Sequence, residues 1–496
     1  MNGVLARWLL PPLLGAVSVA GFAPFGLHPL PVAALALWLL WRPQGVRAAF
    51  LHGWLFGLGL FGAGVSWVHV SIHVFGHSPL PVAIAVAALL AAFLALFPAA
   101  VAALLAWWRR SEAASLLLLF PALWLLAEWL RGRLFTGFPW LSLGYSQIDG
   151  PLAGMAPLVG VYGVGMAAAA LAGALALLLR RAGRSPMAWA LVLLLPLLGT
   201  LLRPVEWTET DGEPLRVSLI QGNIPQERKW QPEERLATLE RYLLMTRNEW
   251  RAPGWHAQLV VWPETAIPAF LHEVADSFLA QLRREAAAAD SDLLVGIPVL
   301  DREDWRYYNG VLHVGAGGGV YYKRHLVPFG EYLPLRRWLG DLLAVMPLPV
   351  ADFSAGDPQQ PPLQVRGVAV GPSVCYEIIF PEEVRQMLPE AGLLVNVSND
   401  AWFGASLGPP QHLEMARMRA LETGRPLLRA TNTGITAVID HHGRILGRAP
   451  QFEPAVVRET IQPRRGATPY VQLGELPVLA LALALVGVAL RRGRRA

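Results

Sequence analysis

Long apolar runs dominate the first 202 residues of the chain, which contain only three acidic residues, Glu112, Glu128 and Asp149. The other 33 of the 36 acids lie further along the chain. A bilayer core of about 30 Å requires roughly 20 apolar residues per spanning helix. This uneven pattern excludes a soluble single-domain protein and also a chain that lies in the membrane throughout. It predicts a membrane-embedded part joined to a water-exposed domain.

Eight apolar segments are predicted to span the membrane as helices. They are residues 4–22, 28–41, 48–68, 80–108, 114–130, 158–179, 185–202 and 474–490. The predicted domains are a membrane domain with seven transmembrane helices at 1–202, a water-exposed domain at 203–473, and the eighth helix with a basic tail at 474–496. The first helix is predicted to stay uncleaved, because six more spans follow it before the soluble domain.

Arginine residues predict the orientation, because loops rich in Arg and Lys stay in the cytoplasm. With the N-terminus inside, the cytoplasmic side receives Arg42, Arg47, Arg109, Arg110, Arg180, Arg181, Arg184, Arg491, Arg492, Arg494 and Arg495. The opposite short loops hold only Arg131 and Arg133, so the domain 203–473 is predicted outside the cytoplasm. Glu128 and Arg131 are interpreted as a snorkelling pair at the interface or, alternatively, as a contact for a lipid headgroup. This topology explains the net charge of +5 better than nucleic-acid binding does.

From about residue 214, β-type runs alternate with amphipathic helical patterns. The predicted strands are Arg216–Gln221, Gln258–Trp262, Leu293–Ile297, Val311–Val314, Val320–Tyr322, Val368–Val374, Leu393–Val397 and Thr436–Asp440, and the predicted helices are Pro232–Arg251, Val274–Ala289 and Pro410–Thr423. Such alternation predicts a layered α/β domain. The glycine-rich stretch 316–319 lies between two strands, with no helix after it, and is predicted to be a turn, not a phosphate loop.

Three reactive side chains follow predicted strands of this domain: Glu264, Lys323 and Cys375. Taken singly, each has an ordinary explanation as a capping carboxylate, an exposed basic strand end or a small buried hydrophobe. Together they form a complete set for nucleophilic catalysis, in which a thiolate attacks and a carboxylate transfers protons. The ammonium would lower the pKa of the thiol and bind the developing oxyanion.

Only two of the 41 basic residues are lysine, Lys229 and Lys323, and the other 39 are arginine. A basic residue needed only for its charge would have drifted to arginine, so Lys323 is predicted to need its compact ammonium. Lys229 is expected in a loop where a charge of either kind serves. His412 and the pair His441–His442 have no spacing typical of metal ligands, and no metal site is predicted.

The segments Trp262-Pro263-Glu264, Tyr321–Glu331 and Cys375-Tyr376-Glu377 resemble the Glu–Lys–Cys triad of the nitrilase superfamily. The eight-span frame, with a domain inserted before the last helix, is similar to that of the bacterial apolipoprotein N-acyltransferase family. Further similar segments are Gln221–Gln226 with Trp230, Asn399–Gly404, Gln411-His412, Arg429–Asn432, Thr136–Trp140 and Gly144–Gln147. The resemblance covers nearly the whole chain and implies an αββα sandwich for the soluble domain.

The resemblance also implies roles for single residues. Glu264 would be the general base, Lys323 the cation that stabilises the oxyanion, and Cys375 the nucleophile. A second active-site glutamate, Glu331, would orient Lys323. The residues that would support the site or the substrate are Tyr376, Glu377 and Trp230.

In the implied reaction, Cys375 attacks an acyl ester of a membrane phospholipid and a lysophospholipid leaves. The thioester then gives its acyl chain to the α-amino group of the diacylglyceryl-cysteine of an apolipoprotein, the last step of lipoprotein maturation. No cofactor or metal is implied. The location would be the bacterial inner membrane, multi-pass, with the catalytic domain on the periplasmic side.

Two other classes of protein compete with this interpretation. A membrane-tethered nitrilase-type amidase, acting on a small amide, would share the triad but would need only one anchor helix. A transporter usually places ionisable residues near the bilayer midplane, and the predicted spans lack them apart from Glu128. Acyl transfer to a lipopeptide amine, compared with hydrolysis of small amides, separates the enzyme classes.

Overall fold

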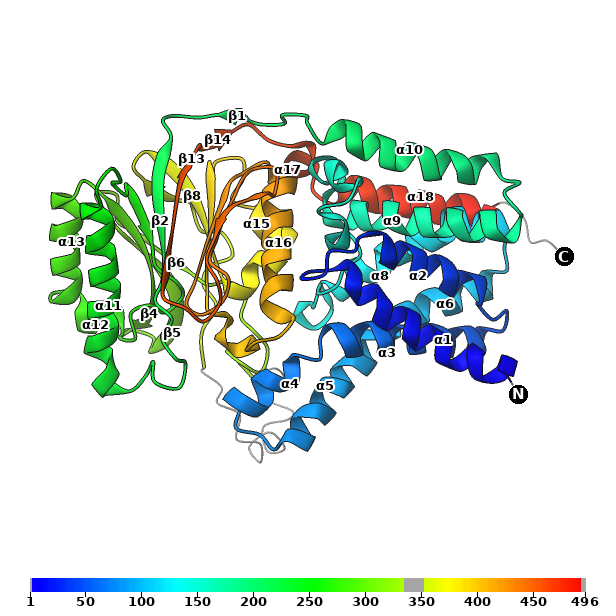
Figure 1. The fold of residues 1–496 in the computed structure, drawn as a ribbon, viewed down its shortest axis with the longest axis horizontal. Helices are drawn as coiled ribbons and strands as arrows, with labels where there is room; N and C mark the ends of the chain where they lie inside the picture. Colours follow the sequence, from blue (N-terminus) through cyan, green and yellow to red (C-terminus); the bar gives the residue numbers. More distant parts are fainter. Residues whose placement is uncertain (1, 334–351, 492–496) are drawn as a thin grey trace.

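The computed structural model describes residues 2–333 and 352–491. A helical part, from the first 202 residues and the last helix, lies beside an α/β part that contains two sheets (Figure 1). The tail residues Arg492, Arg494 and Arg495, used above to predict orientation, lie outside the described residues.

Apolar helices occupy all eight predicted spans. Their bounds are α1 Asn2–Ser18, α2 Pro29–Leu40, α3 Val46–Gly64, α5 Leu80–Leu94, α6 Leu96–Trp108, α8 Phe120–Arg131, α9 Ala156–Arg180, α10 Pro186–Leu202 and α18 Leu476–Arg491, with the short α4 Val68–Val70 and α7 Glu112–Ala114. Among the described residues, four helices are long and apolar enough to cross a membrane: Val46–Gly64, Leu80–Trp108, Glu112–Arg131 and Ala153–Arg180. The other four predicted spans are shorter apolar helices, so a membrane-spanning count of eight stays a prediction.

Glycines allow the first helices to cross closely. A Cβ atom at Gly15 of α1 would lie 2.0 Å from the carbonyl oxygen of Phe56, and one at Gly59 of α3 would lie 1.9 Å from that of Pro12. Both contacts are with backbone, which cannot move aside. Close approach through small residues is the usual way in which helices associate inside a membrane.

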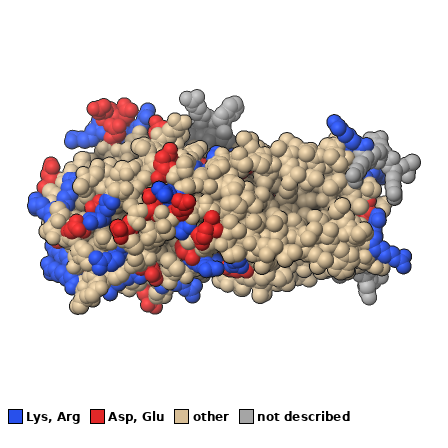
Figure 2. All heavy atoms as spheres, turned by 90° about the horizontal axis from the view of Figure 1, so that it is seen from above, with Lys and Arg blue, Asp and Glu red and all other residues tan. Residues whose placement is uncertain are grey.

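One end of the helical part is tied together by Arg180. Its guanidinium lies 2.8 Å from Glu112 Oε1 and also donates to the carbonyl oxygens of Leu39 and Leu40. The ends of α2 and α9 and the start of α7 therefore meet at one end of the helices. On the face in Figure 2, charged side chains cover the α/β part, while the helical part presents a broad uncharged surface with basic side chains at its far end.

The snorkelling interpretation of Glu128 and Arg131 is wrong. Both side chains are buried. Arg131 donates to the carbonyl oxygens of Phe138 and Trp140, each at 2.6 Å, and Glu128 accepts from the backbone N–H of Leu143 at 2.7 Å. The two residues hold the loop after α8, because a buried charge must find partners.

Two six-stranded sheets form the α/β part. In spatial order the first sheet holds β13 Ala455–Ile461, β2 Leu215–Gln221, β3 Leu259–Val261, β4 Asp292–Asp301, β5 Arg306–Val314 and β6 Val320–Tyr322, and the second holds β12 Ile445–Arg448, β11 Ala437–Ile439, β10 Leu427–Thr431, β9 Leu393–Ser398, β8 Val368–Val374 and β7 Leu363–Val365. A small ladder pairs β1 Glu209–Thr210 with β14 Arg464–Arg465. The glycine-rich turn falls between β5 and β6, as predicted.

Side-chain alternation builds the layers. In β2, Val217 and Leu219 face the second sheet, whereas Ile220 faces the helices, as a period of two requires. The outer face of the first sheet is covered by α11 Pro232–Arg251, α12 Leu271–Val274 and α13 Phe278–Ala288, and that of the second by α15 Pro381–Arg385 and α16 Gly408–Thr423 (Figure 1). The α/β part thus has the expected layer order αββα. The predicted helix Val274–Ala289 corresponds to α13, which begins four residues later, and Val274 is the last residue of α12.

Helix α16 docks the α/β domain onto the membrane helices. Its residue Gln411 accepts a hydrogen bond from Trp140 Nε1 at 2.6 Å, and Glu422 accepts from the backbone N–H of Val161 at 3.1 Å. A second carboxylate, Glu414, accepts from the backbone N–H of Ala23 at 2.9 Å. One continuous apolar core joins the helical part to the outer face of the second sheet. The two parts therefore share a buried interface.

Candidate active site

Cys375 stands at a sharp turn between β8 and the 3₁₀ helix Cys375–Ile379. Its φ of +51° lies in the left-handed region, where a non-glycine residue is strained by about 1–3 kcal/mol. The carbonyl oxygen of Cys375 accepts hydrogen bonds from His412 Nε2 at 3.2 Å and from Asn396 Nδ2 at 3.4 Å. These contacts hold the strained peptide, so the position of the thiol is fixed by its surroundings.

Lys323 follows β6 directly and its side chain is only 1% exposed. Its Nζ lies 2.7 Å from Glu331 Oε1 and 3.9 Å from Glu264 Oε1. The other oxygen of Glu331 accepts from the backbone N–H of Val327 at 2.8 Å. Glu331 is thereby fixed at both oxygens and in turn fixes the ammonium.

Glu264 follows β3 after Trp262 and Pro263. Its Oε1 accepts a hydrogen bond from Asn309 Nδ2 at 2.6 Å. The turn at Glu264 presses on β4 at Gly296, where a Cβ atom would lie 2.3 Å from the carbonyl oxygen of Pro263. Only glycine permits this approach, and it places the carboxylate within reach of Lys323.

Burial and the neighbouring charges shift the pKa values of the three site residues in opposing directions. Burial and the charge of Glu264 raise the pKa of the Cys375 thiol to about 12, while Lys323 acts in the lowering direction. The ammonium therefore acts in the expected direction, but burial outweighs it and the pKa of the thiol is raised. Burial also raises the pKa of Glu264. Burial lowers the pKa of Lys323, but the charges of Glu331 and Glu264 outweigh it and hold that pKa above its usual value.

These shifts describe a resting site with a protonated thiol, a charged ammonium and a carboxylate of increased basicity. A carboxylate of raised pKa is a better acceptor for a thiol proton than an ordinary one. Proton transfer from Cys375 to Glu264 would leave the thiolate beside the ammonium of Lys323. The arrangement can thus generate a nucleophile at the moment of attack.

Glu377 links the Lys323 segment to the turn at Cys375. Its carboxylate accepts hydrogen bonds from Tyr321 Oη at 3.0 Å, from the backbone N–H of Arg324 at 2.6 Å and from that of Val374 at 2.6 Å. Glu377 thus bridges the backbone after Lys323 and the backbone before Cys375.

Tyr376 links the catalytic turn to the membrane half, because its Oη donates to the carbonyl oxygen of Gly137 at 3.0 Å. Gly137 belongs to the loop after α8. The remaining predicted residue, Trp230, is 52% exposed and lies outside the buried polar cluster.

Lys229 lies in the turn before α11, as expected for a loop position, but its side chain is buried. Lys229 is 2% exposed, and its Nζ donates to the carbonyl oxygen of Glu264 at 3.1 Å. Sequence reasoning missed this residue and also Asn309. Asn309 precedes the predicted strand Val311–Val314, and no local pattern marked it as a buried residue.

A buried polar network under Cys375 was also not predicted. Arg429 Nη2 lies 2.7 Å from Asp400 Oδ2 and 3.0 Å from His412 Nδ1. His412 Nδ1 also lies 3.1 Å from Asp400 Oδ1, and the Nε2 of the same ring contacts the Cys375 carbonyl oxygen. Arg429 also donates to Asn396, the second donor to that carbonyl. The hydrogen bonds of this network therefore stabilise the strained turn at Cys375.

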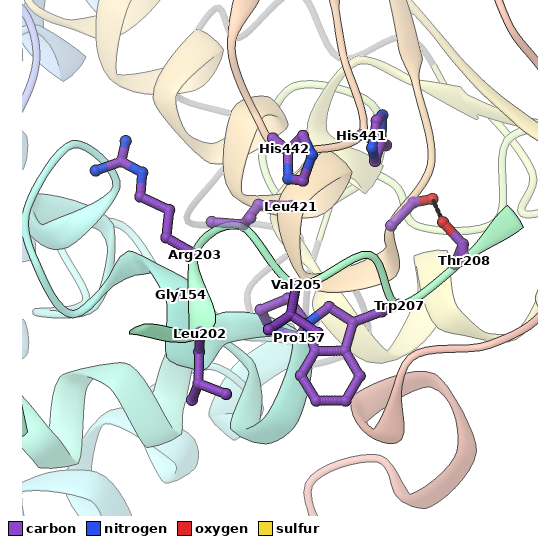
Figure 3. A pocket seen from close by; sticks show the side chains of 11 residues that line it. Gly154, Pro157, Leu202, Arg203, Val205, Trp207, Thr208, Leu421, His441 and His442 are labelled. Atoms are coloured by element: carbon purple, nitrogen blue, oxygen red, sulfur yellow. Dashed lines mark hydrogen bonds between the residues drawn. The ribbon is translucent and has the colours of Figure 1, made fainter. Parts of the chain in front are cut away.

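A second polar cluster lies where the chain passes from α10 into the α/β domain. His441 and His442 face the linker that contains Trp207 (Figure 3). Their Nε2 atoms lie 3.0 and 2.9 Å from the two oxygens of Glu206, a grouping compatible in distance with a metal ion. Arg464 donates to the same carboxylate at 2.5 Å, and its positive charge opposes a second cation there. We interpret the cluster as a set of polar contacts that hold the linker against the α/β domain.

The comparisons with known proteins agree with the two-part architecture. Residues 14–174 match the apolipoprotein N-acyltransferase N-terminal domain, and residues 216–470 match the carbon-nitrogen hydrolase family. A solved structure of Nit3 from Saccharomyces cerevisiae, described as a member of the nitrilase superfamily, covers 51% of this chain and 93% of its own, at 19% identity and a TM-score of 0.39. The family assignment does not depend on this last likeness.

Full-length relatives give the assignment. An apolipoprotein N-acyltransferase of Methylococcus capsulatus is 48% identical over 97% of this chain and 95% of its own. One of Nitrosomonas europaea is 45% identical over 99% of this chain and 98% of its own. The chain therefore belongs to the apolipoprotein N-acyltransferase family, whose catalytic domain is of the carbon-nitrogen hydrolase superfamily.

Proposed function

We propose that this chain transfers an acyl chain from a membrane phospholipid to the α-amino group of the diacylglyceryl-cysteine of an apolipoprotein, through a thioester on Cys375. The observation that supports the proposal is that Glu264, Lys323 and Cys375 lie together in a domain that packs on the apolar helices. A family relationship over the full length supports the same conclusion.

In the first half-reaction, Glu264 takes the proton of the Cys375 thiol as Sγ attacks the ester carbonyl carbon. The carbonyl oxygen becomes an oxyanion, and the ammonium of Lys323 stabilises it. The C–O bond to the glycerol oxygen then breaks. Glu264 returns the proton to that oxygen, a lysophospholipid leaves, and the acyl group remains as a thioester.

In the second half-reaction, the apolipoprotein amine attacks the thioester carbon and loses a proton to Glu264. Lys323 again stabilises the oxyanion. The C–S bond breaks, and the thiolate regains its proton from Glu264. The enzyme returns to its starting state, as ping-pong kinetics require.

Glu331, Glu377 and Tyr376 are proposed to position this machinery, as their hydrogen bonds suggest. Trp230 is proposed to contact a substrate, because an exposed indole offers a large apolar face. None of these steps requires a cofactor.

Contacts between the two parts support entry of lipid substrates at the level of the bilayer. Besides the contact of Tyr376 with the loop after α8, Trp67 of the helical part packs on Phe403 of the α/β domain with ring centroids 4.6 Å apart. Ser71 of the helical part donates to the carbonyl oxygen of Trp402 at 2.6 Å. These contacts between the catalytic turn and the helical part support a lipid-anchored substrate, because a soluble amide substrate would not need them.

Acyl transfer from phospholipid to a diacylglyceryl lipopeptide is the direct test of this function. We expect the purified full-length enzyme to produce the N-acylated lipopeptide, while hydrolysis of small amides stays at background. Mass spectrometry of the lipopeptide and ammonia release from the amides measure the two activities. Amide hydrolysis without acyl transfer would favour the membrane-tethered amidase and contradict the proposal.

We also propose the predicted topology: domains 1–202, 203–473 and 474–496, eight transmembrane helices, and the catalytic domain on the periplasmic side of the inner membrane. Single cysteines at positions 45, 182 and 302, in a Cys375→Ala background, test it with a membrane-impermeant thiol reagent. In intact spheroplasts we expect labelling at position 302 only. Labelling at 45 or 182, with none at 302, would show that the orientation is the opposite of the one proposed.

A further inference from the structure

Lys229 contacts the proposed general base, Glu264, although it has no part in the reaction steps proposed for Glu264, Lys323 and Cys375. It belongs to the turn before α11, where its backbone N–H donates to the carbonyl oxygen of Pro225 at 3.1 Å. Its side chain is buried, and Nζ donates to the carbonyl oxygen of Glu264 at 3.1 Å. The neighbours Arg228 and Trp230 are exposed. Lys229 alone of these three points inward.

A buried ammonium destabilises the folded protein unless a contact or a function compensates for its lost hydration. Removing it from water without a close counter-charge is unfavourable, and burial lowers the pKa of Lys229 to about 8. Within the described residues, no ion pair within 4.0 Å of this Nζ is recorded. The Nζ contact is with a carbonyl oxygen, and the carboxylate of Glu264 partly opposes the effect of burial on the pKa of Lys229. A residue that served packing alone would be replaced by an apolar side chain without loss.

We propose that Lys229 is a positioning residue for the general base, whose ammonium anchors the main-chain carbonyl of Glu264 and favours the charged form of its carboxylate. The inference rests on the proposed function, because it assigns Lys229 a part in the proton transfer from Cys375. The backbone at this turn is under constraint: Thr265, directly after Glu264, has a φ of +50°. An external hydrogen bond to the Glu264 carbonyl helps to hold that geometry.

The charges that face Glu264 decide the sign of the effect. Lys323 and Lys229 lower the pKa of Glu264, and Glu331 raises it, as does burial. Cys375 is the group that gives up its proton to Glu264. Removing the ammonium of Lys229 leaves one cation against a second carboxylate, so the pKa of Glu264 rises. Since Glu264 must be ionised to accept the proton, the acid limb of the acylation rate moves to higher pH.

The experiment measures the rate of thioester formation between pH 5 and pH 9, with full-length enzyme and phosphatidylethanolamine in mixed micelles. Intact mass reports the acylated fraction. For Lys229→Met we expect at least a tenfold loss near pH 6 and an acid limb displaced upward by about one pH unit or more. The rate recovers towards the wild-type value as the pH rises, because Glu264 is then ionised in both proteins.

Two further variants separate charge from packing. Lys229→Gln retains a hydrogen-bond donor of similar length without the charge, so we expect the same displacement of the acid limb with a smaller loss of maximal rate. This variant also tests the inference if Lys229→Met fails to fold. Arg228→Met removes a positive charge from the same turn at an exposed position, and its pH profile should match that of the wild type.

A loss by one constant factor at every pH in both Lys229 variants, with a lowered melting temperature, would show a merely structural residue and overturn the inference. An unchanged profile would overturn it as well. If wild-type enzyme forms no thioester at all, the proposed function has failed. If wild-type enzyme forms it and the Lys229 variants keep their acid limb, only this inference has failed.

Discussion

Incubation of the purified enzyme with phospholipid alone is expected to add the mass of one acyl chain to the protein, at Cys375. The thioester should accumulate because no amine is present to accept the acyl group. The structural reason is the separation of the two half-reactions at one thiol that has its own base and its own oxyanion cation. Addition of a diacylglyceryl lipopeptide should then return the protein to its original mass, and initial rates should give the parallel reciprocal plots of ping-pong kinetics.

Cys375→Ala is the matched control, because it removes only the sulfur atom from the buried turn. It should gain no mass, and acyl transfer should fall by about 10³-fold or more, as for loss of other enzymatic nucleophiles. Alanine tolerates the left-handed φ no better than cysteine does, so the fold should be affected equally. An unchanged wild-type mass, while the complete reaction still ran, would favour direct transfer between the two lipids and contradict the thioester mechanism.

The α/β architecture followed from the sequence because apolar alternation in the central strands is regular. Helix α11 was predicted with its observed bounds, Pro232–Arg251. Strand β10, Leu427–Thr431, was missed although it lies at the centre of the second sheet. Its middle residue is Arg429, and a charged residue normally argues for an exposed segment. Only the fold brings Asp400 to neutralise that charge, and no local pattern contains this information.

The parts of the site that depend on local sequence could be predicted, and those that depend on distant contacts could not. Glu264 and Cys375 follow strands, which is a local property, and strand ends are frequent positions for reactive side chains. The place of Lys229 was not predictable, because its contact with Glu264 spans 35 residues and depends on how one turn folds over another. The cluster of Glu206 with His441 and His442 was missed likewise, since 235 residues separate Glu206 from His441.

Replacement of Lys323 by arginine is expected to reduce acyl transfer by about 100- to 1,000-fold, the usual effect of losing an oxyanion donor. The Lys323 ammonium is buried and lies 2.7 Å from Glu331 and 3.9 Å from Glu264. A guanidinium is planar and wider, with its charge spread over a fork. In this confined space it would meet the two carboxylates but would not place a compact charge at both the thiolate and the oxyanion. Activity of the purified variant, at matched expression and melting temperature, measures the effect.

Lys229, the only other lysine, cannot serve as the control for this exchange, because its side chain is buried against Glu264. Arg228→Lys makes the reverse exchange at an exposed side chain that pairs with Glu234, and we expect activity to be unchanged. Ion pairs at the surface contribute little and accept either cation. If Lys323→Arg transferred acyl chains within a few-fold of the wild type, the site would require only a positive charge. The persistence of two lysines among 39 arginines would then have another cause, and Lys323 would act by general electrostatics alone.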